Sequence, residues 1–375
     1  MKIIFICGCL EPGKDGVGDY TRRLAGELIR QGHQCLILAL MDSFVEFPII
    51  SAQESEFSII QILRLPYING YENNSKYAKK WIEDFNPDFI SLQYVPFSFD
   101  KKGLPIYLSK SIKSLANGRN IHIMFHEMWV GMNIESIIKL KLWGNIQRAL
   151  IKILLYKLAP IVIHTHTSLY QNKILELGFK VSLLEQFGNI MVIKGTPAKL
   201  HYKIKNLKPK LVFAIFGSIH EGAPIDDFIY QLKIYSYIKN IEIEFLFVGR
   251  CGNFIKNWID KLKYADISVK ILGEQSIYQI SKILNSTDVG ITTTPMLLTQ
   301  KSGTVAAMLE HGLPVVCVAK SWQVKSFSAE NIPKSVILFK RDETIDFLSL
   351  KINIASSFCA SKISTDLVNS LLKYI

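Results

Sequence analysis

Short apolar runs alternate along the chain with longer segments in which apolar side chains recur every three or four positions. The short runs are rich in β-branched residues, which is typical of parallel strands covered on both faces. The longer segments are typical of amphipathic helices. In the first half, the pattern predicts strands at 2–8, 35–40, 59–65, 89–94, 121–125 and 161–165, and helices at 20–31, 76–84, 106–115 and 168–177. The first half is therefore expected to be a Rossmann-like αβα domain.

The second half repeats this pattern after a break. It predicts strands at 211–216, 243–248, 269–272, 288–292 and 315–318, and helices at 224–237, 254–264, 277–285, 344–355 and 364–374. Between 188 and 209 the periodicity dissolves into a basic stretch with Gly195 and Pro197, which is typical of a connector. We predict an α/β chain with two doubly wound domains facing across a cleft. Its parts are a domain at 1–190, a linker at 191–209, a domain at 210–360 and a C-terminal helix at 361–375.

Composition narrows the class of protein. A chain of 375 residues with 49% hydrophobic and 20% charged residues is globular and suits two domains. No apolar run reaches the ~18 residues needed to span a bilayer, and residues 1–8 indicate a first strand rather than a signal peptide. Six scattered cysteines without a CxxC motif favour reduced thiols and a cytoplasmic protein. The net charge of +12 predicts an anionic partner, such as a nucleotide, a phosphate-bearing lipid or a membrane surface. No nucleic-acid motif accompanies the charge, so nucleic acid is not expected as a partner.

The loop after the first strand is rich in glycine. Its spacing differs from the dinucleotide-binding fingerprint. We interpret Gly16 and Gly18 as positions where the backbone approaches a ligand, and Asp19 as a helix cap or a partner for a hydroxyl group. In the alternative interpretation, the glycines only form the turn.

His126 and Glu127 follow directly after the strand at 121–125. Ligands of open α/β sheets bind beyond the carboxyl ends of the strands, so this pair is a candidate site. It is not the zinc motif HExxH, because Val130 stands where the second histidine is required. The alternative is a hydrogen-bonded structural histidine.

The stretch from Lys301 to Val318 predicts a loop, a helix, a turn and a strand. Ser302 and Thr304 are good N-cap residues, and Gly303 lets the backbone approach a ligand. The N–H groups and the positive end of the helix dipole converge there, so this loop can hold an anion. Alternatively, the stretch is an ordinary αβ unit of a doubly wound domain.

Residues 137–158 form a long predicted helix in which lysines and one arginine lie among apolar residues and Trp143. Such a helix can lie on an anionic bilayer. It can equally be a core helix with its lysines in water.

The motifs, taken in order, resemble those of retaining family 4 glycosyltransferases of the GT-B fold. In the first half these are 16–25 (GVGDYTRRLA), 31–33 (QGH), 92–96 (LQYVP) and 125–127 (FHE). In the second half they are 216–217 (FG), 248–250 (VGR), 271–273 (ILG), 286–289 (STDV) and 312–316 (GLPVV). The resemblance implies transfer of a sugar, with retention, from a nucleoside diphosphate sugar to a glycan or lipid-linked acceptor. It also implies polysaccharide or glycoconjugate synthesis, carried out in the cytoplasm or peripherally at the inner face of the membrane.

The resemblance also implies roles for individual residues. His126 would lie near the reacting sugar, with Glu127 as a second catalytic candidate. Asp19 and Tyr94 would lie on the acceptor side. The donor and its diphosphate would contact nine positions: Gly16, Gly18, Gly217, Ser218, Arg250, Lys301, Ser302, Gly303 and Thr304. No Asp-x-Asp motif is present, which fits a metal-independent enzyme whose only small-molecule partner on the donor side is the nucleotide sugar.

Two departures from the family pattern raise an alternative. The loop at 218–222 lacks the usual Arg and Lys, and Thr299 and Ala307 stand where the family commonly has two glutamates. In a subgroup with a Ser-Gly pair, the diphosphate would instead rest on the backbone at 302–304, with Lys301 and Arg250 supplying positive charge. The alternative is a non-catalytic GT-B protein or partner subunit that lacks donor chemistry. A sugar epimerase of the same fold is a third option.

Overall fold

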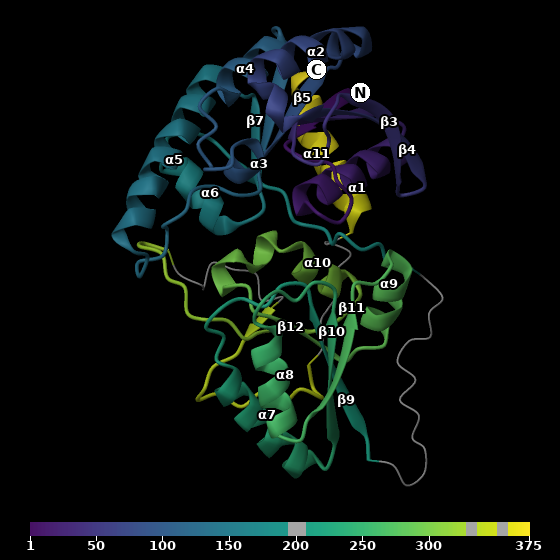
Figure 1. Cartoon of the computed structure of the whole chain (residues 1–375), viewed down its shortest axis with the longest axis vertical. Coiled ribbons are helices and arrows are strands. Elements are labelled where there is room, and N and C mark those ends of the chain that lie inside the picture. The colour runs from purple at the N-terminus through teal and green to yellow at the C-terminus, as the bar shows by residue number, and fades with distance from the viewer. Residues whose placement is uncertain (194–207, 328–335, 351–358) are drawn as a thin grey trace. The chain divides into compact units, whose positions relative to one another are not determined.

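The computed structural model describes residues 1–193, 208–327, 336–350 and 359–375, which form two compact units (Figure 1). Unit 1 comprises Met1–Gln186, Gln323–Phe327 and Cys359–Ile375. Unit 2 comprises Phe187–Trp322 together with the described part of the segment after Phe327. The division falls after Gln186 rather than after 190, and the C-terminal helix belongs to unit 1. Most of the predicted linker lies outside the described residues.

Unit 1 is built on an eight-stranded sheet of order β3-β4-β2-β1-β5-β6-β7-β8. All neighbours are parallel except β3, which runs antiparallel to β4. The central strands β1 and β5 are buried, except for Lys2 at the start of β1, because helices cover both faces. The strands are β1 (Lys2–Cys7), β2 (Gln34–Asp42), β3 (Ile49–Ser55), β4 (Ser58–Pro66), β5 (Phe89–Tyr94), β6 (Asn120–Phe125), β7 (Val162–Thr165) and β8 (Ser182–Leu183).

The helices of unit 1 each place an apolar face against the sheet or against a neighbouring helix. They are α1 (Gly16–Arg30), α2 (Gly70–Phe85), α3 (Pro96–Phe99), α4 (Leu108–Ala116), α5 (Ile138–Leu158), α6 (Ser168–Leu175) and α11 (Ala360–Leu371), with short 3-10 turns at Tyr67–Asn69 and Leu372–Tyr374. The last of these helices, α11, lies beside α1, where Gln31 donates to the Ser364 hydroxyl at 2.7 Å.

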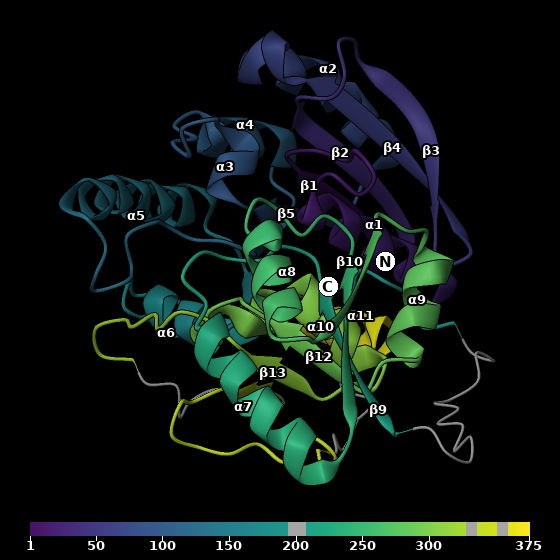
Figure 2. The same ribbon diagram turned by 60° about the horizontal axis from the view of Figure 1, so that its bottom comes forward.

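Unit 2 has a parallel six-stranded sheet of order β11-β10-β9-β12-β13-β14. Its elements are β9 (Lys210–Phe216), α7 (Ile225–Lys239), β10 (Glu242–Val248), α8 (Ile255–Tyr264), β11 (Ser268–Gly273), α9 (Ile277–Asn285), β12 (Val289–Thr292), a 3-10 turn (Met296–Lys301), α10 (Gly303–Glu310), β13 (Val315–Cys317) and β14 (Val336–Leu338). Helices α7 and α8 pack on one face of the sheet through an aromatic-rich core (Figure 2). Helices α9 and α10 pack on the other face.

The predicted α/β class and the two Rossmann-like units are confirmed, with one helix wrong. The helix expected at 344–355 is absent over 344–350, and the remainder lies outside the described residues. Ile345 and Phe347 instead enter the core of unit 2 from an irregular segment. The Tyr235 hydroxyl fixes this segment by donating to Asp346 at 2.6 Å and accepting from the Leu348 N–H at 2.9 Å.

The strand orders locate the binding edge of each unit. In unit 1, the strands that follow β1 are added on one side of it up to β4 and on its other side from β5 onward. In unit 2, the same change of direction occurs at β9, with β10 and β11 on one side and β12 onward on the other. In such sheets, ligands bind beyond the carboxyl ends of the strands at this switch point. The loops after β1, β5 and β6 therefore form the candidate edge of unit 1, and the loops after β9 and β12 form that of unit 2.

Candidate functional site

The edge of unit 2 brings together two predicted segments, the end of β9 and the start of α10. Gly217 has a φ of +86°, which favours glycine, and a Cβ added there would lie 2.8 Å from Cγ2 of Thr304. The two backbones therefore approach as closely as they do because residue 217 has no side chain. The structure thus places Gly217 beside the start of α10, where Ser302, Gly303 and Thr304 lie, and their roles in donor binding stay predictions.

Helix α10 begins at this edge with a regular N-cap. The Ser302 hydroxyl accepts from the Val305 N–H at 3.4 Å and lies 3.1 Å from the Thr304 hydroxyl. The first N–H groups of a helix have no carbonyl one turn earlier to bind, and in α10 these belong to Gly303 and Thr304. They lie at the positive end of the helix dipole. This terminus has the chemistry of an anion site.

The loop after β9 is tied to the end of β12. The buried hydroxyl of Thr293 accepts from the His220 N–H at 2.8 Å, and it lies 3.0 Å from Nδ1 of His220. Burial, and next the positive charge of Lys301, lower the pKa of the His220 imidazole. Lys301 is therefore close enough for its charge to act on the loop that lacks the family's Arg and Lys.

The other basic candidate lies after β10. Arg250 has its Nε 3.8 Å from Glu274, and both side chains are largely exposed. Ser218 is exposed, and its carbonyl accepts from Thr293 at 3.4 Å. Arg250 thus shares its charge with a carboxylate, whereas Lys301 acts on the loop after β9.

The two positions where the family commonly has glutamates are both buried in this structure. A Cβ added to Gly188 would lie 2.5 Å from Cα of Ala307, so these two backbones are in contact and Ala307 is fully buried. Thr299, at the other expected position, is also buried. Glu310, which is out of register, accepts from the Gly188 N–H at 3.2 Å. Position 307 therefore lies in a buried contact between two backbone segments of unit 2.

At the edge of unit 1, the glycine-rich segment differs from the expectation. Helix α1 begins at Gly16 rather than at 20, because Asp15 caps it by accepting from the Val17 N–H at 3.0 Å. Gly16 and Gly18 thus lie in the first helical turn. A Cβ added to Gly18 would lie 2.6 Å from the Cys9 carbonyl oxygen, so this glycine allows the helix to pack against the loop.

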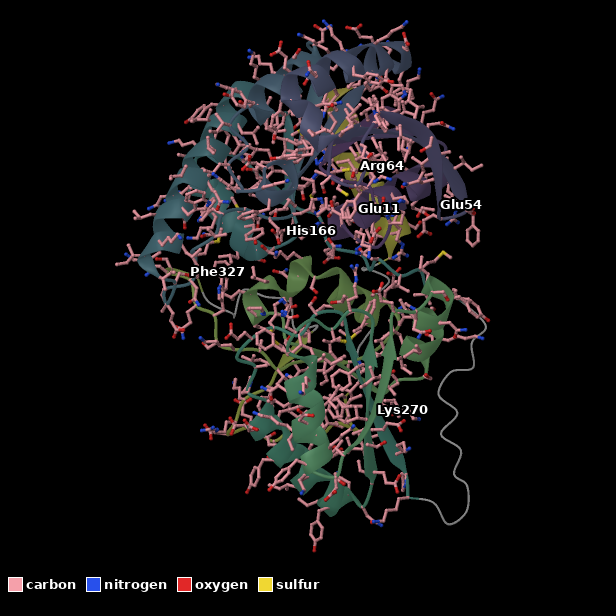
Figure 3. The ribbon with its side chains drawn as sticks, viewed as in Figure 1. Glu11, Glu54, Arg64, His166, Lys270 and Phe327 are labelled. Atoms are coloured by element: carbon pink, nitrogen blue, oxygen red, sulfur yellow. The ribbon has the colours of Figure 1, made fainter. Side chains whose placement is uncertain are left out.

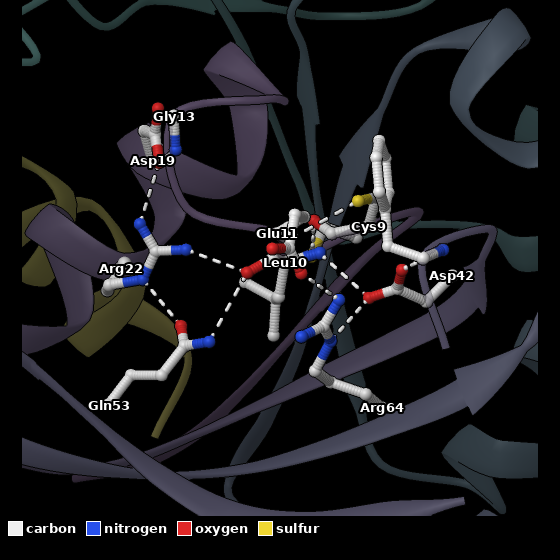
Figure 4. A network of polar contacts seen from close by, with 11 residues as sticks. Cys9, Leu10, Glu11, Gly13, Asp19, Arg22, Asp42, Gln53 and Arg64 are labelled. Carbon is white, nitrogen blue, oxygen red and sulfur yellow. Dashed lines mark hydrogen bonds and ion pairs between the residues drawn. The ribbon is translucent and has the colours of Figure 1, made fainter. Parts of the chain in front are cut away.

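The loop between β1 and α1 is braced by arginines that sequence reasoning missed (Figure 4). Arg64 contacts the buried Asp42 at 2.7 Å and Glu11 at 2.7 Å. Arg64 and Glu11 are labelled next to each other in Figure 3. Asp42 also accepts from the Leu10 N–H at 3.1 Å. The only sequence signal for this ion pair is Arg64 itself, which interrupts the apolar C-terminal end of β4.

Asp19 belongs to this same brace. It accepts from the Gly13 N–H at 3.1 Å and from Arg22 at 2.7 Å, while Arg22 donates to the Leu10 carbonyl at 2.9 Å (Figure 4). Asp19 therefore closes the loop and does not cap the helix. Its predicted contact with an acceptor stays a prediction.

A chain of buried hydrogen bonds runs through unit 1 from β7 to β6 and β5. His166, labelled in Figure 3, places Nδ1 2.9 Å from the Leu184 carbonyl and Nε2 3.0 Å from Nδ1 of His126. Nε2 of His126 lies 2.8 Å from Oε1 of Gln93. The chain continues from Gln93 to Ser91 at 2.8 Å, from Ser91 to His122 at 2.8 Å and from His122 to His164 at 3.0 Å.

This geometry couples the charge of His126 to one amide. The Leu184 carbonyl can only accept, so Nδ1 of His166 carries a proton. With the oxygen of Gln93 facing His126, Nε2 of His126 must donate as well, and the two histidines then share three protons and one positive charge. If the amide of Gln93 is turned, both rings are neutral and every bond is satisfied. His126 therefore has protein partners at both ring nitrogens, which are Gln93 and His166.

The remaining candidates of unit 1 are packed around this chain. The Tyr20 ring lies edge-on to His126, with centroids 4.8 Å apart. Tyr94 is almost fully buried against Phe99 and Phe125, so it belongs to the core in this structure. The Glu127 N–H donates to the Tyr94 carbonyl at 3.4 Å. The roles predicted for Tyr94 and Glu127 stay predictions.

Neither a metal-binding cluster nor a membrane-spanning helix occurs within the described ranges. Among those residues, no group of three or more His, Cys, Asp or Glu side chains is placed to hold a metal ion. None of the helices in the described parts is long and apolar enough to cross a membrane. All six cysteines are free thiols, and five are buried, as expected from their scattered positions.

Comparison with known proteins identifies the fold. No protein-family model and no curated protein sequence matches the chain. Among solved structures, it is similar to Anabaena Alr3699/HepE in complex with UDP and glucose, with a TM-score of 0.60, 15% identity and full coverage of both chains. It is similar to sucrose-phosphate synthase from Thermosynechococcus elongatus, with a TM-score of 0.58, 13% identity and coverage of 100% of this chain and 94% of that one. It is also similar to UDP-GlcNAc 2-epimerase from Neisseria meningitidis bound to UDP-GlcNAc, with a TM-score of 0.56, 13% identity and full coverage of both chains.

These similarities confirm the predicted GT-B fold. At identities of 13–15%, they establish the fold alone. These solved structures include proteins bound to UDP or to a UDP-sugar, and they include both a synthase and an epimerase. The choice between these chemistries rests on the site of this chain.

Proposed function

We propose that the chain is a glycosyltransferase that moves a sugar from a nucleoside diphosphate sugar to a glycan or lipid-linked acceptor, with retention. The observation that carries this proposal is the edge of unit 2, where Gly217 meets Thr304 at the N-terminus of α10 beside Lys301. The UDP complexes of HepE and the epimerase support a uridine nucleotide as the first donor to test.

In this proposal, unit 2 stabilises the departing nucleoside diphosphate. The N–H groups of Gly303 and Thr304 would donate to diphosphate oxygens, and Lys301 would offset the charge that develops as the sugar–phosphate bond breaks. Arg250 and Ser218 would contribute from the neighbouring loops. Backbone donors and a lysine supply this charge without a metal ion, so we propose metal-independent transfer.

Unit 1 would contribute the acceptor side. His126 would act near the reacting sugar while Gln93 and His166 hold its ring, and Glu127 is the second candidate. A basic chain with an exposed, lysine-rich helix suits an acceptor at an anionic membrane surface, so we propose peripheral action in polysaccharide or glycoconjugate synthesis.

A second proposal is a non-catalytic protein of the same fold. It is favoured by the loop at 218–222, which has no Arg or Lys, and by Thr299 and Ala307, which stand where the family commonly has glutamates. The epimerase among the similar structures keeps sugar epimerisation as a third option. These options differ in what happens to a bound nucleotide sugar: transfer to an acceptor, no reaction, or conversion to its epimer.

The test is a thermal-shift screen with UDP, GDP, ADP, dTDP, CMP and their sugars, followed by product analysis. A ligand at ~100 times its dissociation constant adds about 2.7 kcal/mol to the free energy of unfolding. We expect one diphosphate to raise the melting temperature, and its sugar to be released only when acceptor is added. Binding without release would favour the non-catalytic protein. Absence of any shift in folded protein would contradict the transferase and the epimerase, which are the two proposals that require a bound nucleotide sugar.

A further inference from the structure

Helix α5 carries two apolar stripes. One packs against unit 1, whereas the other is exposed and contacts unit 1 at its end, where the Tyr156 ring lies edge-on to Phe179 with centroids 5.0 Å apart. The packed stripe consists of the buried residues Gly144, Gln147, Ile151, Leu154, Leu155 and Leu158. The second stripe consists of Ile138, Leu142, Ile146, Ala149, Ile153 and Tyr156, all exposed. Its five large side chains are 45–76% exposed. An ordinary surface helix has polar residues at these positions.

The exposed stripe is continuous and straight. Its residues are spaced by three or four positions, so at about 100° per residue they share one face, opposite the packed stripe. From Ile138 to Tyr156, the stripe extends about 27 Å along the helix. In Figures 1 and 2, α5 lies at the margin of unit 1.

Cations line both sides of this exposed stripe. On the same angular scale, Lys141, Arg148 and Lys152 lie on one side, and Lys139 and Lys157 on the other. The sequence of α5 contains no aspartate or glutamate. An apolar stripe between two rows of cations is the pattern of a helix that lies in the interface of an anionic bilayer.

We propose that this exposed stripe of α5 is a docking surface for an anionic lipid bilayer. The aliphatic side chains would enter the boundary between headgroups and acyl chains, and the flanking cations would contact lipid phosphates. A second copy of the chain fits less well, because pairing two such stripes would bring lysines against lysines. The proposal extends the membrane-associated transfer proposed above, but its test does not require that the chain transfers sugar.

Trp143 is a brace rather than the inserted anchor. Its indole N–H donates to the Lys102 carbonyl at 2.9 Å, and its ring lies between the two stripes. Lys141 reaches the Ile134 carbonyl at 2.8 Å, and Arg148 lies over the Trp129 ring. These three residues hold α5 in place, so the test leaves them unchanged.

The experiment is flotation of the full chain with phosphatidylcholine vesicles, either alone or containing phosphatidylglycerol. The stripe variant combines Leu142→Ser, Ile146→Ser and Ile153→Ser. Its control combines Tyr237→Ser, Ile238→Ser and Ile277→Ser, which are exposed apolar residues of unit 2. The charge variant combines Lys139→Gln, Lys152→Gln and Lys157→Gln, and its control combines Lys233→Gln, Lys256→Gln and Lys263→Gln.

We expect the wild type and both controls to float with anionic vesicles and to dissociate at high salt. The charge variant should bind roughly 100-fold more weakly, and the stripe variant at least about tenfold more weakly. Wild type that stays at the bottom at low salt would overturn the proposal, as would a stripe variant that floats like its control. A wild-type dimer that becomes monomeric in the stripe variant, with vesicle binding unchanged, would assign the stripe to a second copy instead.

Discussion

The carboxyl edges of the two sheets are built in different ways. At the edge of unit 1, charged and polar side chains bind one another: Arg64 joins Asp42 to Glu11, and His126 is held between Gln93 and His166. At the edge of unit 2, small residues bring backbones together, and a helix starts directly after a lysine. The first edge is fixed by its own side chains, whereas the second offers main-chain donors to a ligand. We therefore propose that the anion binds to unit 2.

If unit 1 is held by its charged network, Arg64→Met should have the largest effect on stability. The substitution leaves Asp42 buried without its cation, and loss of one partner of a buried pair costs about 3–5 kcal/mol. Urea unfolding measures this change. Lys76→Met is the control, because Lys76 pairs with Glu72 on an exposed face of α2. Equal stability of the two variants would show that the network does not brace the loop.

The histidine chain of unit 1 predicts a second effect, on the pH dependence of stability. Burial lowers the pKa of His164 from 6.5 to about 4 and that of His122 well below its usual value. Between pH 6.5 and about pH 4, His164 binds a proton in the unfolded chain but not in the native chain. Its contribution to the free energy of unfolding is therefore fully present above pH 6.5 and is lost as the pH falls towards 4. The contribution of His164 is about 3 kcal/mol.

Urea unfolding at several pH values checks this prediction. His164→Gln should reduce the loss of stability between pH 6.5 and 4, while the loss from carboxylates at lower pH remains. A variant that loses as much stability as wild type over this interval would contradict the assigned pKa of His164.

At the edge of unit 2, Gly217→Ala should separate strain from binding. The substitution forces alanine into a positive φ and places its Cβ against Thr304, whereas Gly252→Ala introduces similar strain at a φ of +75° with no atom within 4 Å. Both should lose about 1–2 kcal/mol of stability. Only Gly217→Ala should lose nucleotide affinity in a calorimetric titration with UDP. Equal UDP affinities of the two variants would show that the contact between residue 217 and Thr304 is not part of the binding site.

The smallest expected effect is that of Lys301. Lys301→Gln should weaken UDP binding about tenfold, or about 1.4 kcal/mol, while Lys256→Gln should leave it unchanged. Without ligand, loss of this charge should raise the pKa of His220, which an NMR titration measures. An unchanged His220 would show that Lys301 does not act on the loop after β9.

The fold was readable from the sequence because buried parallel strands consist of nearly unbroken apolar runs. Strand β3 was missed because it is mostly exposed and lacks such a run. The start of α1 was misplaced because glycines are poor helix formers, yet Asp15 caps the helix there. The helix predicted at 344–355 is wrong over the described residues 344–350, because tertiary packing of Ile345 and Phe347 outweighed a helical pattern.

The site was less readable than the fold. A cap and a glycine-rich turn are local signals, so the segment at 301–304 could be found. The pair of Arg64 and Asp42 joins two strands, and the chain from His166 to His164 joins three. Partners of this kind are set by strand order and register, which one sequence does not display.

The central claim is that the diphosphate binds the backbone of unit 2 at the start of α10. Hydrogen exchange of peptides covering 301–308, with and without UDP, tests it most directly. We predict slower exchange of the Gly303 and Thr304 amides with UDP, and little change in peptides covering 9–19 of unit 1. UDP binding that protects the 9–19 segment and leaves 301–308 unchanged would contradict the claim.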